Sequence, residues 1–513
     1  MKRIYIIFAA LAVGSILING CAKKHANYYR KVDLDGRYAI VGRYPVTEEA
    51  AMRVNCYHYE YNKGKLIKVE YLKGNRLSNS SFFGNDVAAV IVEYVDGFEK
   101  RTYLNAKGNP AVSNDGVYSI RLKLDEDKRA VSLINYDKQG NLANDRYGVA
   151  QYAWAVDKYG RRIESIRLNK DRQRIVDANG FFKLRWKYDK NGNVTELSNH
   201  RENDQLLEGE NNIASTRFQY DKQGNKIEES HYGINSKLKE DKALGVAIIR
   251  WKYDDYGNVI ETRYFGTAEK LKDQKDLGVA IIEQKYDVAG NPIEQKYFGT
   301  DEKLKERKDL GVAISYSTYD EYGRVTEESY FGTDEKPVEN KVIQANIVRY
   351  QYDVDGNRIE QQYLDADGKL KEDKNTGIAI IRALYDKDGN ATETRYFGAD
   401  NKLKARIDLG AAIVRWQHDE QGRRIEEAYF DINDQPTTHK NLGVAIVRLK
   451  YDNQGNKVEE SYYGTDGKRK AIKNTRVAIL RREFDQKGVL AKTIFIDANE
   501  KVLYTKNELK AGR

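Results

Sequence analysis

The chain has 513 residues and a formal net charge of +9, with 87 lysines and arginines against 78 aspartates and glutamates. Acids and bases are interspersed, so the excess charge lies on a mixed, solvated surface and does not form a nucleic-acid-binding patch. Only five prolines occur, and no long low-complexity stretch is present, which argues against flexible linkers between domains.

The N-terminus has the layout of a secretory signal peptide. Met1-Lys2-Arg3 is a short basic start, and the apolar run from Ile4 to Ile18 is too short for a comfortable membrane span. The ending Leu17-Ile18-Asn19-Gly20-Cys21 resembles the lipobox of bacterial lipoproteins, in which the leader is cut before the cysteine and the cysteine is acylated. The resemblance implies that residues 1–20 are removed and that Cys21 carries the lipid. An ordinary signal peptide with a chance cysteine is the alternative.

A lipid on Cys21 implies attachment to the bacterial envelope. Ala22 follows the cysteine where Asp would favour the inner membrane, so the enterobacterial sorting pattern indicates the outer membrane. Several acyl chains together anchor a protein firmly. Residues 21–50 are then expected to form a tether and an irregular N-terminal cap. Cys56 has no disulfide partner once Cys21 is lipidated, and it is expected to be a small buried hydrophobe.

The rest of the chain is a repeat array. A tyrosine followed by aspartate recurs with a period of 33, as from Tyr253 to Tyr286, and this regular region extends over residues 246–500. Divergent copies with less regular spacing are traced over residues 51–245, which gives about fourteen units in all. Residues 501–513 are expected to be a polar tail. The motif residues on which the array depends are Tyr253, Asp254, Gly257, Tyr286, Asp287, Gly290, Tyr319, Asp320, Gly323, Tyr352, Asp353 and Gly356. His418 and Phe484 fill the tyrosine slot where tyrosine is missing.

Each unit is predicted to be a β-hairpin. Residues 246–253 and 259–265 alternate between two faces, as strands do. Asp254-Asp255-Tyr256-Gly257 is predicted to be a type I turn, with Asp first and Gly last. The hydrophobic pattern predicts a register with Tyr253 opposite Asn258 and Arg250 opposite Glu261. The same Arg–Glu pairing is then expected within other hairpins, namely Arg185–Glu196, Arg217–Glu228, Arg349–Glu360, Arg382–Glu393, Arg415–Glu426 and Arg448–Glu459.

The stretches between hairpins are polar and lysine-rich. The segment from Gly266 to Gly278 carries two leucines, which are expected to tuck under the sheet. Ankyrin repeats share the period but need two helices in each unit, and the arms here are rich in β-branched and aromatic residues. The predicted fold is therefore all-β, an elongated array of hairpins that forms a continuous twisted or spiral antiparallel sheet, similar to a solenoid.

The motif Tyr-Asp-x-x-Gly-Asn/Arg resembles the YD repeat of the Rhs and teneurin families. It is carried by stretches such as Tyr188-Asp189-Lys190-Asn191-Gly192-Asn193, and the resemblance spans most of the chain from Tyr61 to Phe484. In those families the repeats form a long strand spiral that acts as a shell or spacer at cell surfaces. The unit here is longer, and neither the family's Asp-Pro-x-Gly-Leu-type core segment nor a toxin module is recognisable, so toxin delivery is not implied.

The sequence contains no recognisable catalytic motif, and no cofactor or metal site is predicted. Asp353-Val354-Asp355-Gly356-Asn357 begins like a calcium loop, but Arg358 stands where that loop needs glycine and Leu364 where it needs glutamate. Two aromatic columns invite two interpretations, core packing or a stacking platform for sugars or peptides. One contains Trp154, Trp186, Trp251 and Trp416, and the other contains Tyr264, Tyr297, Tyr330, Tyr363, Tyr396, Tyr429 and Tyr462.

These observations predict an envelope-anchored binding or scaffolding module without catalysis. The expected partners are the membrane, through the N-terminal lipid, and a glycan polymer or surface protein, read by many weak equivalent sites such as the column of Arg250, Arg349, Arg382, Arg415 and Arg448. Two alternatives remain. A shell or carrier for a secreted protein would be favoured by a closed hollow coil, and an envelope-glycan enzyme by one non-repeating acidic pair in a deep pocket.

Overall fold

The computed structural model describes residues 27–74, 76–80, 82–420, 422–452, 456–484 and 490–507. In this part of the chain, 32 strands form a single sheet with antiparallel pairing, and the one α-helix is a single turn, α1 (Glu48–Ala51). No helix among the described residues is long and apolar enough to cross a membrane. The all-β repeat fold predicted from the sequence is confirmed. The signal peptide and Cys21 lie outside the described residues.

The strands of the first part are β1 (Tyr28–Leu34), β2 (Ile40–Val46), β3 (Cys56–Asn62), β4 (Lys65–Lys73), β5 (Arg76–Leu77), β6 (Ala89–Val95), β7 (Phe98–Leu104), β8 (Ser119–Leu124), β9 (Ala130–Tyr136), β10 (Gln151–Val156), β11 (Arg162–Leu168), β12 (Lys183–Tyr188), β13 (Val194–His200), β14 (Ser215–Tyr220), β15 (Lys226–Tyr232), β16 (Ile248–Tyr253) and β17 (Val259–Phe265).

The strands of the second part are β18 (Ile281–Tyr286), β19 (Pro292–Phe298), β20 (Ile314–Tyr319), β21 (Val325–Phe331), β22 (Ile347–Tyr352), β23 (Arg358–Leu364), β24 (Ile380–Tyr385), β25 (Ala391–Phe397), β26 (Ile413–His418), β27 (Arg424–Phe430), β28 (Ile446–Tyr451), β29 (Lys457–Tyr463), β30 (Ile479–Phe484), β31 (Leu490–Ile496) and β32 (Val502–Asn507).

Neighbours in the sheet follow the chain almost throughout. Fourteen hairpins, from β3–β4 to β30–β31, correspond to the fourteen units expected from the sequence. Residues 28–46, expected as tether and cap, form an additional hairpin, β1–β2, and β1 also pairs with β3. Residues 502–507, expected as polar tail, form β32 and pair with β31. These two additions extend the sheet at both ends.

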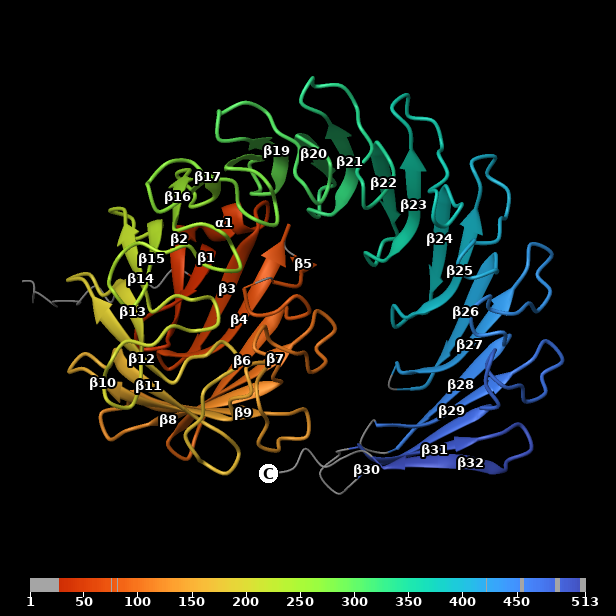
Figure 1. Ribbon diagram of the computed structural model, residues 1–513, viewed down its shortest axis with the longest axis horizontal. Helices are drawn as coiled ribbons and strands as arrows, with labels where there is room; N and C mark the ends of the chain where they lie inside the picture. Colours follow the sequence, from red (N-terminus) through yellow and green to blue (C-terminus); the bar gives the residue numbers. More distant parts are fainter. Residues whose placement is uncertain are drawn as a thin grey trace, which may run out of the picture.

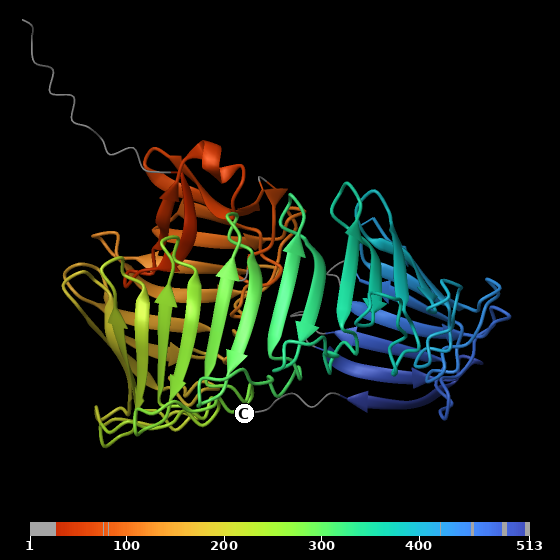
Figure 2. The same cartoon turned by 90° about the horizontal axis from the view of Figure 1, so that it is seen from above.

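The sheet winds into an open spiral (Figures 1 and 2). Strands β1 to β17 curl into a tight coil, and β18 to β32 continue with the same sense of curvature as a wide arc. Hairpin turns of later units touch the first strands, which holds the coil together. The hydrogen bonds are Arg43 to the Gln223 carbonyl (3.2 Å), Lys31 to the Asn258 side chain (2.9 Å), Arg30 to the Ala289 carbonyl (3.0 Å), Arg76 to the Val354 carbonyl (3.2 Å) and Lys107 to the Asp388 carbonyl (2.6 Å).

One face of the sheet is concave and holds the core of the tight coil. The side chains at the positions equivalent to Ile249, Trp251 and Tyr264 converge there, and we call it the inner face. In the tight coil it packs against Val32 and Ile40 of the first hairpin in a cluster with Tyr59, Val69, Val90, Val92, Tyr103, Ile120, Leu122, Leu133 and Trp154. Cys56 is fully buried, as predicted, and burial raises the pKa of its thiol to about 11.

The observed register differs from the predicted one by two residues along most of the hairpin and by one residue at the motif tyrosine. Tyr253 lies opposite Val259, Trp251 opposite Thr262 and Arg250 opposite Arg263, with a bulge between Lys252 and Tyr253. The predicted faces survive because a shift of two residues keeps each side chain on its face. The prediction failed because Gly257, in the left-handed region with φ +78°, and the bulge add residues to the end of the hairpin that periodicity does not reveal.

The predicted Arg–Glu pairs within hairpins are therefore wrong, and each arginine instead meets the glutamate of the preceding unit. Arg250 binds Glu228 at 2.6 Å, and Lys252 takes the place opposite Glu261. The other observed pairs across units are Arg185–Glu164, Arg217–Glu196, Arg349–Glu327, Arg382–Glu360, Arg415–Glu393, Arg448–Glu426 and Arg481–Glu459. These contacts join neighbouring hairpins on the outer face of the sheet.

The connectors are turns, and their leucines pack against the sheet as expected. Leu271 lies against Phe265 and Ala247, and Leu277 against Val279 and Tyr297. In the tight coil the connector turn has four residues, and the amide of Gly180 binds the carbonyl of Asp177. From Asp241 onward it has five, and the amide of Gly245 binds the carbonyl of Asp241. The inserted residue, Leu244 in the first such turn, lengthens the spacing of the repeat tyrosines from 32 between Tyr188 and Tyr220 to 33.

Candidate functional site

The motif tyrosine binds one unit to the next. The hydroxyl of Tyr253 donates to the carbonyl of Lys226, the first residue of the second strand in the preceding hairpin, at 2.7 Å. Three further motif tyrosines, Tyr286, Tyr319 and Tyr352, make the equivalent bond to Val259, Pro292 and Val325 at 2.9–3.0 Å. The motif tyrosine therefore links neighbouring hairpins, and its hydroxyl proton is used in this structural hydrogen bond.

The motif aspartate closes the turn. Asp254 Oδ1 accepts the backbone N–H of Tyr256 and of Asn258, and Oδ2 accepts the Asn258 side chain at 2.9 Å. Asp287 and Asp353 bind the asparagine four residues later in the same way, and Asp320 binds Arg324. The turn glycines all have positive φ, a backbone conformation that glycine adopts without strain. The values are +78° for Gly257, +93° for Gly290, +68° for Gly323 and +91° for Gly356. In the stretch that resembles a calcium loop, both carboxylate oxygens of Asp353 therefore accept hydrogen bonds within the turn.

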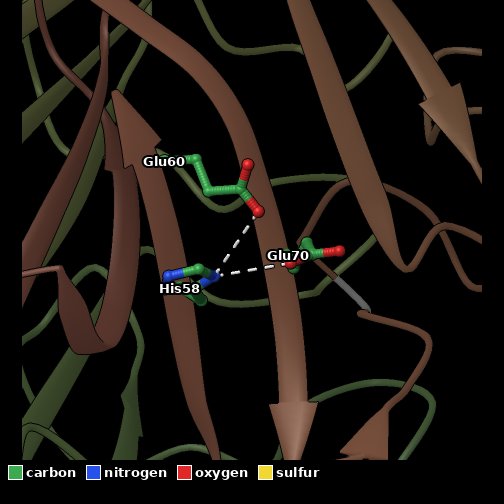
Figure 3. A group of neighbouring side chains, drawn as sticks. All are labelled: His58, Glu60 and Glu70. Atoms are coloured by element: carbon green, nitrogen blue, oxygen red, sulfur yellow. Dashed lines mark hydrogen bonds and ion pairs between the residues drawn. The ribbon is translucent and has the colours of Figure 1, made fainter. Parts of the chain in front are cut away.

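A small group of potential metal ligands lies on β3 and β4. His58 Nδ1 is 3.4 Å from Glu70 and 4.0 Å from Glu60. Figure 3 shows His58 pointing toward both carboxylates. The Lys68 ammonium lies 2.5 Å from Glu70 and 3.5 Å from Glu60, and the ring of Tyr28 stacks on His58. A lysine already supplies the positive charge that a metal ion would bring, so these residues form a salt-bridged network and not a vacant ligand set.

The tyrosine column of the inner face changes character in the tight coil. Where the arc has tyrosine, successive units of the coil have Asn135, Arg167, Asn199 and His231, all at most 4 % exposed. Each polar side chain has a local partner: Val149 carbonyl, Asp177 carboxylate, Gly180 carbonyl and Glu229 carboxylate, respectively. The array is therefore not uniform, and its polar, non-repeating part is buried in the coil.

Two cavities open beside this polar column. The larger, of about 250 Å³, is lined among others by Asn199, Glu229, His231 and Asp241. The smaller, of about 160 Å³, lies under Tyr38, whose ring comes from the loop between β1 and β2. Its lining includes Asp115, Asn135, Asp145, Tyr152, Trp154, Arg162, Ser165, Arg167 and Trp186. We call the smaller one the Tyr38 cavity. Sequence reasoning missed it, although the loss of tyrosine at Asn135 and Arg167 was a signal.

The Tyr38 cavity contains two carboxylates outside the repeat pattern. Asp145 is buried and saturated, because it accepts the backbone N–H of Tyr147 and Val149 and the Tyr152 hydroxyl at 2.6 Å. Asp115 is half-buried, and burial together with the charge of Asp145 raises the pKa of its carboxyl. The two acids therefore differ in environment, one fixed in the scaffold and the other inclined to hold a proton.

The arc offers a different surface, a polar and aromatic stripe along the middle of its inner face. Its members are half-buried: Gln284, Gln295, Ser317, Glu328, Tyr350, Gln361, Trp416 and Glu427. We call this the inner stripe. The Tyr350 hydroxyl donates to Glu328 at 2.8 Å, whereas the indole N–H of Trp416 has no hydrogen-bond partner among the described residues. The tyrosine column beside the stripe is core, since Tyr297, Tyr330, Tyr429 and Tyr462 are at most 4 % exposed.

Comparison with known proteins gives structural similarity only. No family model and no curated protein matches the chain. Among solved structures, TcdB2-TccC3-TEV is 11 % identical with a TM-score of 0.30 over 94 % of this chain and 27 % of that one. The Photorhabdus luminescens Tc holotoxin pore is 10 % identical with a TM-score of 0.22 over 92 % and 25 %. The chain spans about a quarter of these proteins, and TM-scores this low assign neither family nor function.

Proposed function

We propose that the protein is a non-catalytic binding or scaffolding module of the bacterial envelope, anchored through Cys21, that holds an extended partner on the inner stripe of its arc. The carrying observation is the stripe itself, a row of half-buried hydrogen-bonding and aromatic side chains on the open concave face. The YD-like turn motif supports the same proposal, because the Rhs and teneurin repeats that it resembles serve as surface shells and spacers.

The proposal differs in one respect from the arginine ruler suggested by the sequence. Arg349, Arg382 and Arg448 already pair with glutamates at 2.5–2.7 Å on the outer face, so their charges are not free for a ligand. The inner stripe instead offers acceptors and amides, together with the buried indole N–H of Trp416, which has no hydrogen-bond partner among the described residues. A glycan polymer, rich in hydroxyls and with apolar ring faces, matches this chemistry. Contacts in successive units would add by avidity.

A C-terminal truncation series tests the proposal. Chains ending after β31, β29, β27 and β25 are purified, and their binding to isolated envelope glycan and to envelope protein is measured. We expect affinity for the glycan to fall gradually as units are removed. Retained binding in all truncations, or complete loss on removal of a single unit, would contradict an extended site. Mass spectrometry of the mature N-terminus tests the anchor: an unmodified peptide that begins elsewhere would rule out lipidation at Cys21.

The first alternative, a shell or carrier for a secreted protein, is not favoured by the shape of the sheet. In the described residues β2 and β32 are edge strands that do not pair with each other, so the coil is not closed. An enzyme acting on envelope glycans has one specific observation in its favour, the pair Asp115 and Asp145 in the Tyr38 cavity. Glycoside hydrolysis uses two carboxyl groups that flank the bond to be broken. Release of reducing sugar from envelope glycan by the purified chain, abolished by Asp115→Asn, would replace the binding proposal with this one.

A further inference from the structure

Arg162 lacks a charge partner that three of its counterparts have. In three other units the second strand begins with a cation that pairs with a glutamate three residues later, whereas Arg358, like Arg162, has no glutamate there, since Gln361 fills that position. These pairs are Lys226–Glu229 at 2.5 Å, Lys457–Glu460 at 2.8 Å and Arg424–Glu427. In the unit of Arg162 the glutamate is replaced by Ser165, and no carboxylate of the described residues pairs with Arg162. The cation is kept and its acid is removed.

The guanidinium of Arg162 is enclosed by aromatic rings. It lies 4.9 Å from the ring centre of Tyr38 and 5.2 Å from those of Trp154 and Trp186, and its Nε donates to the Gly36 carbonyl at 3.3 Å. Burial lowers the pKa of Arg162, because the surroundings disfavour the charged form. Arg162 is half-buried. A charge that is partly withdrawn from water without a counter-ion is costly, so an anion beside it would be stabilising.

A second arginine in the same cavity has an unused donor. Arg167 is 4 % exposed, and its Nε binds Asp177 at 2.5 Å. Its Nη1 is buried and has no hydrogen-bond partner among the described residues. Buried donors without partners are uncommon in folded proteins. Arg167 is also the only arginine in a column that otherwise holds tyrosine, asparagine, histidine or phenylalanine from Tyr103 to Phe495.

We propose that the Tyr38 cavity binds a small cyclic carboxylate. The carboxylate would lie on Arg162 and Arg167, whose planar guanidinium groups suit it, and the ring would lie against Trp154 and Trp186. The cavity volume of about 160 Å³ is well below the roughly 300–1,000 Å³ of pockets for drug-sized ligands, so a single ring fits the space. Asp115 and Asn135 line the same cavity and supply partners for ring hydroxyls.

Asp145 does not oppose such a ligand strongly, since backbone amides and Tyr152 already hold both of its oxygens. Asp115 accepts a proton more readily than an ordinary aspartate and then becomes a donor. The chemistry described is that of an acidic sugar. An acidic sugar occurs as a free monosaccharide acid or as the terminal uronic acid of a glycan. The second source requires that the end of the glycan chain enters the cavity.

This site lies in the tight coil and does not involve the inner stripe, so it stands independently of the proposed function. The test uses the full chain and three probes: glucuronate, glucose, and an oligosaccharide with a terminal glucuronic acid. Binding is measured by calorimetry and by tryptophan fluorescence. The fluorescence reports on this site because two of the four tryptophans of the chain line the cavity. We expect glucuronate to bind and glucose to bind at least about tenfold more weakly, as the loss of a charged hydrogen-bonding group implies.

Two variants locate the binding. Arg162→Gln should weaken glucuronate binding by about ten- to a hundredfold. Ser165→Glu supplies the acid found in three other units and should cause a similar loss while Arg162 is retained. If Arg162→Gln does not fold, Arg162→Lys keeps the charge and loses the planar fork. A matched control comes from the arc, where Arg358 occupies the slot of Arg162. Arg358→Gln should leave binding unchanged.

The outcomes separate the sources and the hypotheses. Binding of glucuronate without the oligosaccharide identifies a free small molecule, and binding of both identifies a glycan end. Equal binding of glucose and glucuronate, no binding of any probe, or unchanged binding in folded Arg162→Gln or Arg162→Lys would overturn the proposal. None of these results depends on the truncation series, which can succeed or fail separately.

Discussion

Units of the tight coil and units of the arc share one hairpin but pack its inner face differently. In the arc the column beside the connectors is tyrosine, and the five-residue connector turn adds a leucine that packs against it, as Leu277 and Leu310 do with Tyr297 and Tyr330. In the coil the turns before Asp241 are one residue shorter, and the column is polar from Asn135 to His231. Arg167 reaches across to Asp177 in the connector itself.

The inserted connector residue accompanies the change between the two kinds of interior. It is leucine in most arc units, and the exceptions include Ile343 and Thr376. An extra leucine permits an apolar column that seals the connector side of each unit. Without it, buried polar side chains must find hydrogen-bond partners in the short turn, and cavities remain where they do. The regular units are thus specialised for repetition, and the irregular ones carry the features that are unique in the chain. Four experiments test this division.

The first experiment removes one unit from the arc. Deletion of residues 411–443 takes out one period of 33 residues and leaves the following strands in phase, because each unit mainly contacts its neighbours. We expect a folded protein with one cooperative transition in circular dichroism. Deletion of residues 427–443 removes about half a period. β28 would then have to take the position of β27 in the sheet although it runs in the opposite direction, so we expect the region after the deletion to unfold. Equal unfolding by both deletions would contradict the independence of the units.

A unit that touches the first coil should tolerate deletion less well. Residues 278–310 also span one period, but their turn binds Arg30 through the Ala289 carbonyl at 3.0 Å and Asn55 through Asn291 at 2.8 Å. Their removal should lower the melting temperature more than deletion of residues 411–443. If the two deletions of equal length have the same melting temperature, the contacts between coil and arc add no stability.

The second experiment breaks the buried pair of the coil. Arg167 and Asp177 are 4 % and 3 % exposed as side chains and lie 2.5 Å apart. Asp177→Asn keeps an oxygen for the turn amides but leaves the arginine charge uncompensated, so we expect a loss of about 3–5 kcal/mol of unfolding free energy. The control is Asp309→Asn in the arc, whose pair with Arg307 is partly exposed and should cost about 1 kcal/mol or less. Urea unfolding measures both, and similar losses would show that burial does not set the difference.

The third experiment compares two turn glycines with the same backbone conformation. Gly192 and Gly257 have φ +89° and +78°, where an L residue is strained by roughly 1–2 kcal/mol. An added Cβ at Gly192 meets nothing within 4 Å, whereas at Gly257 it lies 2.4 Å from the ring of Tyr44. Gly257→Ala should therefore destabilise the protein more than Gly192→Ala in urea unfolding. Combining Gly257→Ala with Tyr44→Ala should remove the excess, and persistence of the excess would exclude Tyr44 as its cause.

The sequence predicted the local structure of this protein well and its long-range structure poorly. Alternation in residues 246–265 and the motif Tyr253-Asp254-Gly257 predicted the hairpins, their number and the inner and outer faces, because these depend on neighbouring residues. The packing of Tyr38 on Trp154 links positions far apart in the chain, and no period announces it. The Tyr38 cavity follows from that contact, so only the loss of tyrosine at Asn135 and Arg167 hinted at it.

The register is where local reasoning failed, and the fourth experiment, with the smallest expected effect, tests the correction directly. The sequence placed Arg382 opposite Glu393 in the same hairpin, whereas the structure places it 2.5 Å from Glu360 of the preceding unit. A double-mutant cycle with Arg382→Ala and Glu360→Ala should give a coupling of about 0.2–1 kcal/mol, since the arginine is 38 % exposed and solvent screens the pair. The cycle with Glu393→Ala should give none, because Glu393 pairs with Arg415. The cycles are measured in low salt, because weak screening there makes a coupling of about 0.2–1 kcal/mol largest relative to the measurement error. A larger coupling to Glu393 than to Glu360 would restore the predicted register and would shift every hairpin in the array by two residues.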